Sequence, residues 1–153
     1  MDAPATGIRI IPPLLFLAMF LIAWLLHWLV PLRLGLSPAF QTAGTILSLA
    51  TLVVAVYLAI AFQRGGSSFN TTKIPKNLIT GGLLRFSRNP AYIDLIALGV
   101  GIALMFDSLW VLVLMVPAVV ILQREVILKE EALLEHQFGE EYRRYKARVR
   151  RWL

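Results

Sequence analysis

Two long apolar runs open the chain, and each is long enough to cross a membrane. They cover residues 10–30 and 39–62. About twenty apolar residues in an α-helix, rising about 1.5 Å per residue, span the roughly 30 Å of hydrocarbon in a bilayer. The pattern predicts two transmembrane helices joined by a short turn. Gly44, Ser48 and Ala55 are small residues of the second run, where another helix can approach closely.

A third apolar region, residues 93–122, is divided by the pair Asp107-Ser108 into two shorter runs. Each run has about 14 residues, which is short for a full span. The region therefore predicts a tight helical hairpin, which either crosses a thin part of the bilayer with its polar flanks or lies partly immersed. Ala97 and Gly101 allow the two hairpin helices to pack closely, and Pro117 predicts a kink in the second.

The stretch between the second run and the hairpin, residues 63–88, is polar and basic and is predicted to lie outside the membrane. It leads into TGGLLRFSRNPAY, residues 80–92. Ser87 or Asn89 can cap a helix there, and Pro90 suits the first helical position because its missing N–H would be unpaired in any case. A helix start is the simplest interpretation.

A second interpretation of this stretch is a binding site. A helix N-terminus presents free N–H groups and a partial positive charge, and Arg85 and Arg88 flank it here. The acidic pair Glu130-Glu131 follows the hairpin, and both segments emerge at the same membrane face. They are expected to meet, either as part of a ligand pocket or as an ion-pair cluster that ties the tail to the loop.

The tail, residues 123–153, is charged and helical in pattern, with Gly139 as a predicted break and a basic end. Lys and Arg gather in the 63–88 loop and in this tail, whereas the turn before the second run holds only Arg33. This asymmetry predicts that both termini and the central loop lie in the cytoplasm. The expected fold is all-α: an integral membrane protein with about four transmembrane helices, of which the last two form the short hairpin, and a cytoplasmic C-terminal helical tail.

Composition supports this class and excludes others. The chain is 58% hydrophobic with a mean hydropathy of +0.73, too apolar for a soluble domain of 153 residues. Its net charge of +6 sits at the edges of apolar runs, as expected beside anionic lipid headgroups, so we expect a membrane and no nucleic acid as partner. It has no cysteine, and no metal site is predicted. Nothing in the sequence indicates an oligomeric state.

The segment LITGGLLRFSRNPAYIDLIALG, followed by KEEALLEHQFGEEYRRYKARVRRWL, resembles the isoprenylcysteine carboxyl methyltransferase and phospholipid methyltransferase family in its short bacterial form. The shared motifs are T-x-G…R-[HN]-P-x-Y and E-E-x-x-L…F-G-x-x-Y-x-x-Y. The likeness covers roughly residues 64–153. It implies one membrane methyltransferase domain, 1–153, in which 1–62 hold two transmembrane helices and 63–153 hold the cofactor loop, the hairpin and the tail. It also implies a bacterial inner membrane.

The resemblance implies S-adenosylmethionine as cofactor and a lipid-like or prenyl-type acceptor with a carboxylate or an amine. It implies catalytic roles for Arg88 and Glu130. The implied cofactor-binding residues come from the loop, the R-N-P-x-Y segment and the acidic pair: Lys76, Asn77, Leu78, Ile79, Leu84, Asn89, Pro90, Ala91, Tyr92, Glu130 and Glu131.

The implied reaction is an in-line attack of the acceptor on the activated methyl group, for which the protein mainly aligns the reactants and excludes water. An amine acceptor would first have to lose a proton, whereas a carboxylate would not. Leu84 and Val126 depart from the residues common in the family. Three alternatives therefore stand beside the enzyme: a small membrane scaffold, a transporter-like subunit, and an inactive family member.

Overall fold

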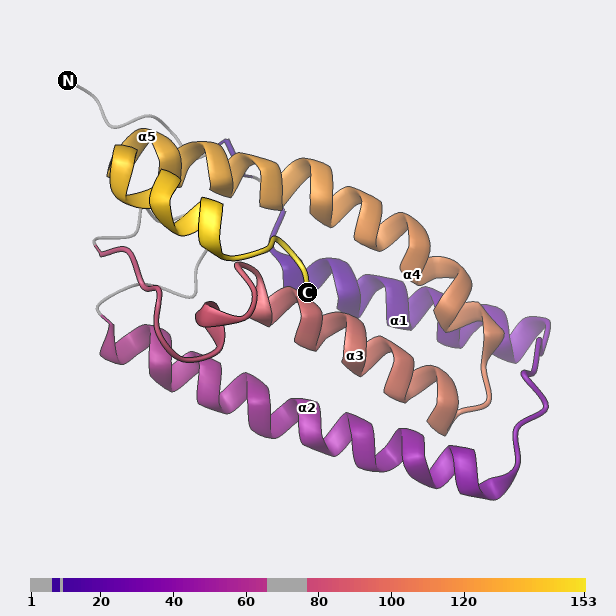
Figure 1. Ribbon diagram of the computed structural model, residues 1–153. Coiled ribbons are helices and arrows are strands. Elements are labelled where there is room, and N and C mark those ends of the chain that lie inside the picture. Colours follow the sequence, from indigo (N-terminus) through magenta and orange to yellow (C-terminus); the bar gives the residue numbers. More distant parts are fainter. Residues whose placement is uncertain (1–6, 9, 66–76) are drawn as a thin grey trace.

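A computed structural model describes residues 7–8, 10–65 and 77–153. Its helices are α1 (Pro12–Leu29), α2 (Pro38–Arg64), the 3₁₀ turn η1 (Gly82–Arg85), α3 (Pro90–Met105), α4 (Leu109–Ile121), the π-helical segment η2 (Leu122–Ile127) and α5 (Leu128–Arg148). Helices α1 to α4 run side by side as an antiparallel bundle, and α5 lies across one end of it (Figure 1). The predicted all-α class is confirmed, and within the described residues no extended strand forms.

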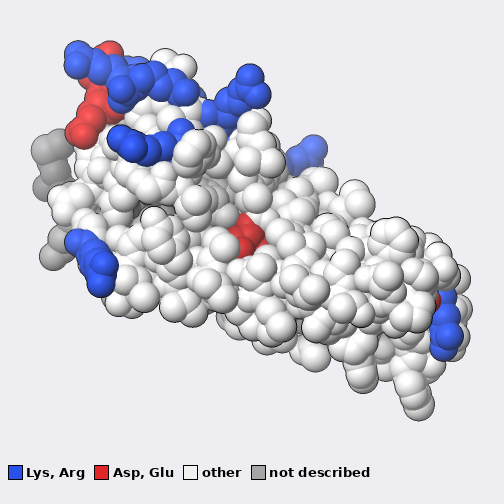
Figure 2. All heavy atoms as spheres, turned by 60° about the horizontal axis from the view of Figure 1, so that its bottom comes forward, with Lys and Arg blue, Asp and Glu red and all other residues white. Residues whose placement is uncertain are grey.

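Three helices in the described part of the chain are long and apolar enough to cross a membrane: α1, α2 and the continuous helix that begins with α4. Helix α3 is apolar but has only 16 residues. On the face shown in Figure 2, Lys and Arg gather around the α5 end and a small charged spot lies at the opposite end. The surface between them is uncharged except for one acidic patch. The long sides of the bundle are thus suited to lipid.

Helix α2 packs most extensively on α3, through small residues. Gly44 and Ser48 are buried, and a Cβ atom on Gly101 would lie 2.5 Å from Ser48 Oγ, so the two backbones are in close approach. The prediction for Gly44 and Ser48 is confirmed. Ala55, however, is exposed, because the buried positions of α2 continue instead through Thr51 and Leu58.

The prediction that Gly101 packs the two hairpin helices together is wrong. Gly101 faces α2, and it is Gly99 that faces α4, with Met115 Sδ 2.7 Å from the position of a Cβ. Residues two apart on a helix point about 200° apart, so the two glycines serve different neighbours. Helix α3 therefore packs on both sides and is the most enclosed of the apolar helices.

The two turns at the end of the bundle away from α5 are tied together. Leu109 N–H donates to Leu32 O at 3.0 Å, and Asp107 Oδ1 accepts the Leu36 N–H at 3.0 Å. Trp110 Nε1 donates to Val30 O at 2.7 Å. The turn at Asp107-Ser108 was predicted, and these bonds show that it holds the α1–α2 turn to the α3–α4 turn.

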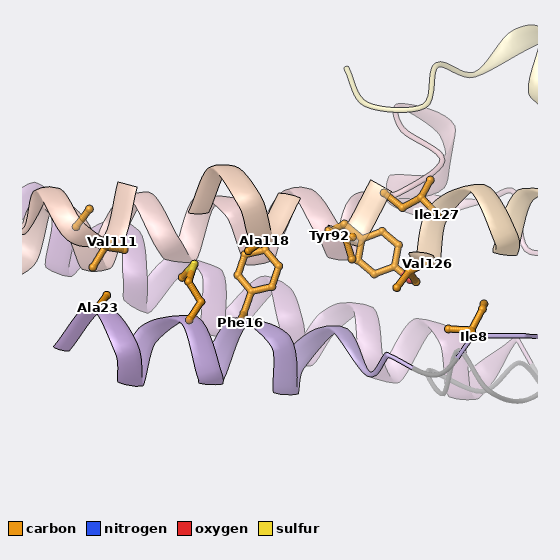
Figure 3. Close-up of a cluster of buried hydrophobic side chains, with 11 residues drawn as sticks. Ile8, Phe16, Ala23, Tyr92, Val111, Ala118, Val126 and Ile127 are labelled. Atoms are coloured by element: carbon orange, nitrogen blue, oxygen red, sulfur yellow. The ribbon is translucent and has the colours of Figure 1, made fainter. Parts of the chain in front are cut away.

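The chain does not break where the predicted hairpin meets the tail. Helix α4 continues through η2 into α5, because no glycine or proline lies between Pro117 and Gly139. The predicted break at Gly139 is confirmed, with φ of 50° and ψ of −118° inside the last helix. The buried cluster of this region joins the start of α3 to η2, and Figure 3 shows Tyr92 beside Val126 and Ile127.

Candidate active site

The first polar contact of the site joins α3 to α5. Tyr92 lies on the first turn of α3 and Glu130 on the first turn of α5, and the Tyr92 hydroxyl donates to Glu130 Oε2 at 2.7 Å. The Tyr92 side chain is buried and Glu130 is partly buried. The expected meeting of the R-N-P-x-Y segment with the acidic pair is therefore present.

Glu130 is poised to change its charge near neutral pH. It lies in the charged α5, beyond the apolar part of the long helix. Burial raises the pKa of the Glu130 carboxyl to about 7; the Tyr92 hydrogen bond opposes this rise and the neighbouring Glu131 charge adds to it. No ion pair among the described residues includes Glu130. A cationic ligand group would stabilise its carboxylate form.

The neighbouring Glu131 has a different environment. Arg151 donates to it through Nε and Nη2, each at 2.8 Å, and Arg88 Nη2 lies 3.3 Å from its Oε1. Successive helical residues project about 100° apart, so Glu130 faces Tyr92 while Glu131 faces these two guanidinium groups. The ion-pair interpretation of the acidic pair thus holds for Glu131, whose charge is compensated inside the protein.

Arg88 retains hydrogen-bonding capacity. Its side chain is 9% exposed, and its Nε and Nη1 are buried without a hydrogen-bond partner in the described part of the chain. A buried donor without a partner costs about 1–3 kcal/mol, so such groups usually meet water or a ligand. The trio of Arg88, Arg151 and Glu131 carries a net charge of +1 and is suited to an anionic group.

The C-terminal segment, residues 149–153, returns across the start of α3 (Figure 1). Arg88 N–H donates to Arg150 O at 2.9 Å. The Ser87 hydroxyl and the Asn89 amide both donate to Arg151 O, at 3.1 and 2.9 Å. These bonds fix the R-N-P segment against the tail.

The prediction that Ser87 or Asn89 caps the helix is confirmed for the position of Asn89, but not for a capping bond from its side chain. Asn89 occupies the N-cap position of α3, but neither side chain bonds the first-turn N–H groups. The Asn89 amide is engaged by Arg151 O, and Ser87 Oγ accepts the Asn89 N–H at 3.1 Å. Pro90 does occupy the first helical position, where it is buried, and Ala91 beside it is half-buried.

Two tyrosines of α5 hold the glycine turn that precedes the site. The Tyr145 hydroxyl donates to the carbonyl of the buried Leu84 at 2.8 Å, and Tyr142 is 1% exposed. Gly82 has φ of 60°, a conformation that residues with a Cβ rarely adopt. Tyr145 of the F-G-x-x-Y-x-x-Y motif thus holds η1, and the ring of Tyr142 packs against that of Tyr145. The sequence reasoning did not assign this role.

The remaining predicted residues lie before this turn. Asn77 Nδ2 donates to Gly65 O at 3.1 Å, which attaches the loop to the end of α2. Ile79 packs against the same glycine, and Leu78 is half-buried like Ile79. Lys76 lies outside the described residues.

Sequence reasoning missed Arg151. It is one of several arginines in a basic tail, so nothing in the local pattern distinguishes it. Only the return of the chain over the start of α3 brings its guanidinium to Glu131 and its carbonyl to Ser87 and Asn89.

The fold and this cluster define an all-helical integral membrane protein with a polar site where the bundle meets its charged end. Residues 39–141, more than half of the chain, match the family model described as phospholipid methyltransferase. The chain belongs to this family, which confirms the resemblance seen in its motifs.

A curated protein of Haemophilus influenzae, described as uncharacterized, is 51% identical over 35 residues, which is 23% of this chain and 56% of that protein. The chain thus spans about half the length of this relative. No solved structure matches the chain.

Proposed function

We propose that this protein is an S-adenosylmethionine-dependent methyltransferase that acts at the cytoplasmic membrane interface on a lipid-like acceptor. The observation that carries the proposal is a pair of oppositely charged groups that keep binding capacity near the start of α3. Glu130 is a partly buried carboxylate without a cationic partner in the described structure. Arg88 is a buried cation that lies beside Glu131 and Tyr142, and its Nε and Nη1 make no hydrogen bond to the described residues. Both lie next to the first turn of α3.

These groups fit the chemistry of the implied cofactor. S-adenosylmethionine carries a cationic sulfonium and a carboxylate, and when bound it supplies an activated methyl group. We assign its carboxylate to Arg88, where charge-assisted hydrogen bonds would satisfy the buried donors, and a cationic group to Glu130. Asn77, Leu78, Ile79, Leu84, Asn89, Pro90, Ala91 and Tyr92 form the proposed surrounding wall, together with Lys76.

The protein's own contribution is mainly alignment and exclusion of water. Oriented reactants in a dry site can lower a barrier by roughly 7–11 kcal/mol. If the cofactor's cation is held elsewhere, Glu130 can instead accept a proton from an amine acceptor near neutral pH, because the pKa of its carboxyl is about 7 without a cationic partner. The site is thus suited to either an amine or a carboxylate acceptor.

The proposed location follows from charge. The site lies at the α5 end, where Lys and Arg gather (Figure 2). Short loops and tails that are rich in Lys and Arg are usually retained in the cytoplasm. We place both termini and the site there, in a bacterial inner membrane, with four spans that include the short α3.

Calorimetric titration of the detergent-purified protein with S-adenosylmethionine tests the proposal. Saturable binding is expected, and Glu130→Ala and Arg88→Gln should each weaken it. Glu140→Ala is the matched control, because Glu140 lies on the same helix in an exposed ion pair with Arg143. A folded protein without binding would contradict the proposal and favour the scaffold, transporter-subunit or inactive-member alternatives.

A further inference from the structure

The cationic group that the proposed function assigns to the cofactor is enclosed in this structure. The Arg88 side chain is 9% exposed, and its Nε and Nη1, which have no hydrogen-bond partner among the described residues, are buried. Its neighbours Ser87 and Asn89 are buried as well, and so is its ion-pair partner Glu131. A ligand carboxylate therefore cannot reach these Arg88 donors from solvent unless a neighbouring part of the protein moves.

Two parts of the chain lie against the turn formed by residues 87–89, and they differ in how firmly they are packed. Helix α5 contacts the turn through Glu131 and through Tyr142, which is 1% exposed. The C-terminal segment, residues 149–153, has no regular secondary structure, and none of its residues is buried. Segments with few buried contacts open locally at a low free energy, whereas packed helices do not. The C-terminal segment is therefore the part that can move.

The attachment of the C-terminal segment to the turn is extensive but partly exposed. Three hydrogen bonds join the turn to the backbone carbonyls of Arg150 and Arg151 (Figure 1). The Arg151 guanidinium binds the buried Glu131 while its own side chain is 33% exposed. Trp152 is half-buried and packs against the buried apolar cluster of the bundle. Besides the hydrogen bonds, two side chains therefore hold the segment in place.

The position of the segment also sets the charge beside Arg88. With the segment in place, Arg88, Arg151 and Glu131 together carry a net charge of +1. With the segment moved away, Arg88 and Glu131 remain and their charges cancel. An anion bound at Arg88 therefore stabilises the closed arrangement, because it interacts more favourably with a net positive charge.

We propose that the C-terminal segment is a gate of the cofactor site. It moves away from the turn at residues 87–89 to admit the cofactor, and it closes again once the cofactor's carboxylate is bound at Arg88. The gating role rests on the proposed function, whereas opening of the segment in the ligand-free protein does not depend on it.

Hydrogen exchange of the purified full-length protein, resolved to single residues by fragmentation in mass spectrometry, tests the opening. The Arg88 amide is the reporter, because its hydrogen bond goes to Arg150 O, and the Leu98 amide inside α3 is the reference. In the ligand-free wild type, the Arg88 amide should be about a hundredfold less protected from exchange than the Leu98 amide. Equal protection of the two amides would overturn the proposal.

Two variants loosen the segment without removing a charge. Trp152→Ala removes the apolar contact, and Leu153→Ala, at the exposed neighbouring position, is its matched control. Arg151→Lys keeps the positive charge but loses the bidentate contact with Glu131. Exchange of the Arg88 amide should be about tenfold faster in Trp152→Ala and in Arg151→Lys, and unchanged in Leu153→Ala. An unchanged rate in both loosened variants would contradict the proposal.

The kinetics of S-adenosylmethionine binding to the immobilised protein, measured by surface plasmon resonance, test the gating role. Trp152→Ala should bind and release the cofactor about tenfold faster, with little change in affinity, because the gate opens more often in both states. A purely structural role would instead speed dissociation alone, and that result would overturn the gate. S-adenosylmethionine should also slow exchange of the Arg88 amide in the wild type. Faster exchange would mean that the cofactor displaces the segment and would equally overturn the proposal.

The two measurements separate this proposal from the proposed function. Saturable binding of S-adenosylmethionine with rates that Trp152→Ala leaves unchanged would overturn the gate and leave the proposed function standing. A folded wild type whose Arg88 amide exchanges rapidly but which does not bind S-adenosylmethionine would overturn the gating role together with the proposed function.

Discussion

Two adjacent glutamates at the start of α5 have opposite electrostatic situations. Glu131 is buried between two guanidinium groups, and Glu130 shares a single hydrogen bond with a tyrosine. The sequence motif joins them as a pair, but the helix directs them to different partners. Glu131 is thus a structural anchor for the tail, and Glu130 is the group that we propose faces a ligand.

The pH dependence of ligand binding should identify Glu130 as that group. The pKa of its carboxyl is raised to about 7, so the carboxylate fraction increases as the pH rises from 6 to 8. Affinity for S-adenosylmethionine should increase about tenfold over this interval if the carboxylate faces a cation. In Glu130→Gln this component of the pH dependence should be absent, which calorimetric titrations of both proteins at several pH values can measure.

The protein without ligand should show the opposite trend. A carboxyl whose folded pKa is above its unfolded value of 4.5 stabilises the fold fully below pH 4.5, and this contribution is lost as the pH rises through 7. A pH profile of thermal unfolding that is identical for wild type and Glu130→Gln would contradict this assignment.

Replacement of Arg151 tests the anchor. Arg151→Ala should destabilise the protein by about 1–3 kcal/mol, because Glu131 keeps Arg88 but loses its bidentate partner. Arg150→Ala is the matched control, since Arg150 is exposed and contributes its backbone carbonyl to the site. Thermal unfolding in detergent measures both. Equal unfolding temperatures for the two single variants would show that the ion pair contributes little.

At the scale of elements, α3 is held by the close approach of α2 and by the π-helical segment. The segment η2 places Val126 and Ile127 against Tyr92, and the widened turn sets the rotation at which α5 begins (Figure 3). Because Glu130 and Glu131 follow directly, this rotation determines which partners they face. The Tyr92–Glu130 contact is therefore set by helix packing.

The small residues between α2 and α3 should be intolerant of larger ones. Gly44→Leu should destabilise the protein by about 1–3 kcal/mol, because a Cβ at this position would already lie 2.5 Å from Met105 N. Ala43→Leu, at the exposed neighbouring position, is the control. Thermal unfolding in detergent should separate the two variants, and equal stability would show that α2 and α3 can move apart at little cost.

At the scale of the molecule, polarity sorts the chain into two ends and a lipid-facing middle. The α5 end carries the candidate site, and the opposite end, where Figure 2 shows a small charged spot, holds the linked turns. Large apolar side chains are exposed along α1 and α2, as expected for surfaces that face lipid. We propose that the α5 end lies in the cytoplasm, because Lys and Arg gather there.

The absence of cysteine makes this orientation directly testable. In intact cells, a membrane-impermeant maleimide should label Arg33→Cys and should not label Arg143→Cys. Permeabilised cells should show labelling of both positions, which serves as the control for reactivity. The reverse pattern in intact cells would place the site on the other face of the membrane.

The sequence by itself determined the class of fold, because the length and apolarity of a run are local quantities that a membrane converts directly into helices. It also identified the two segments of the candidate site and the turn at Asp107-Ser108. The residue types within each of these segments favour its conformation locally. The break at Gly139 is of the same kind, since glycine readily adopts a positive φ.

Only the tertiary structure decided which partners the residues of these segments face. The spacing of Gly99 and Gly101 does not reveal that Gly99 packs against α4 and Gly101 against α2. The sequence shows many arginines in the tail, but only the path of the C-terminal segment assigns Arg151 to Glu131. Such pairings depend on how whole helices rotate and pack. That packing is determined jointly by residues that are distant in sequence.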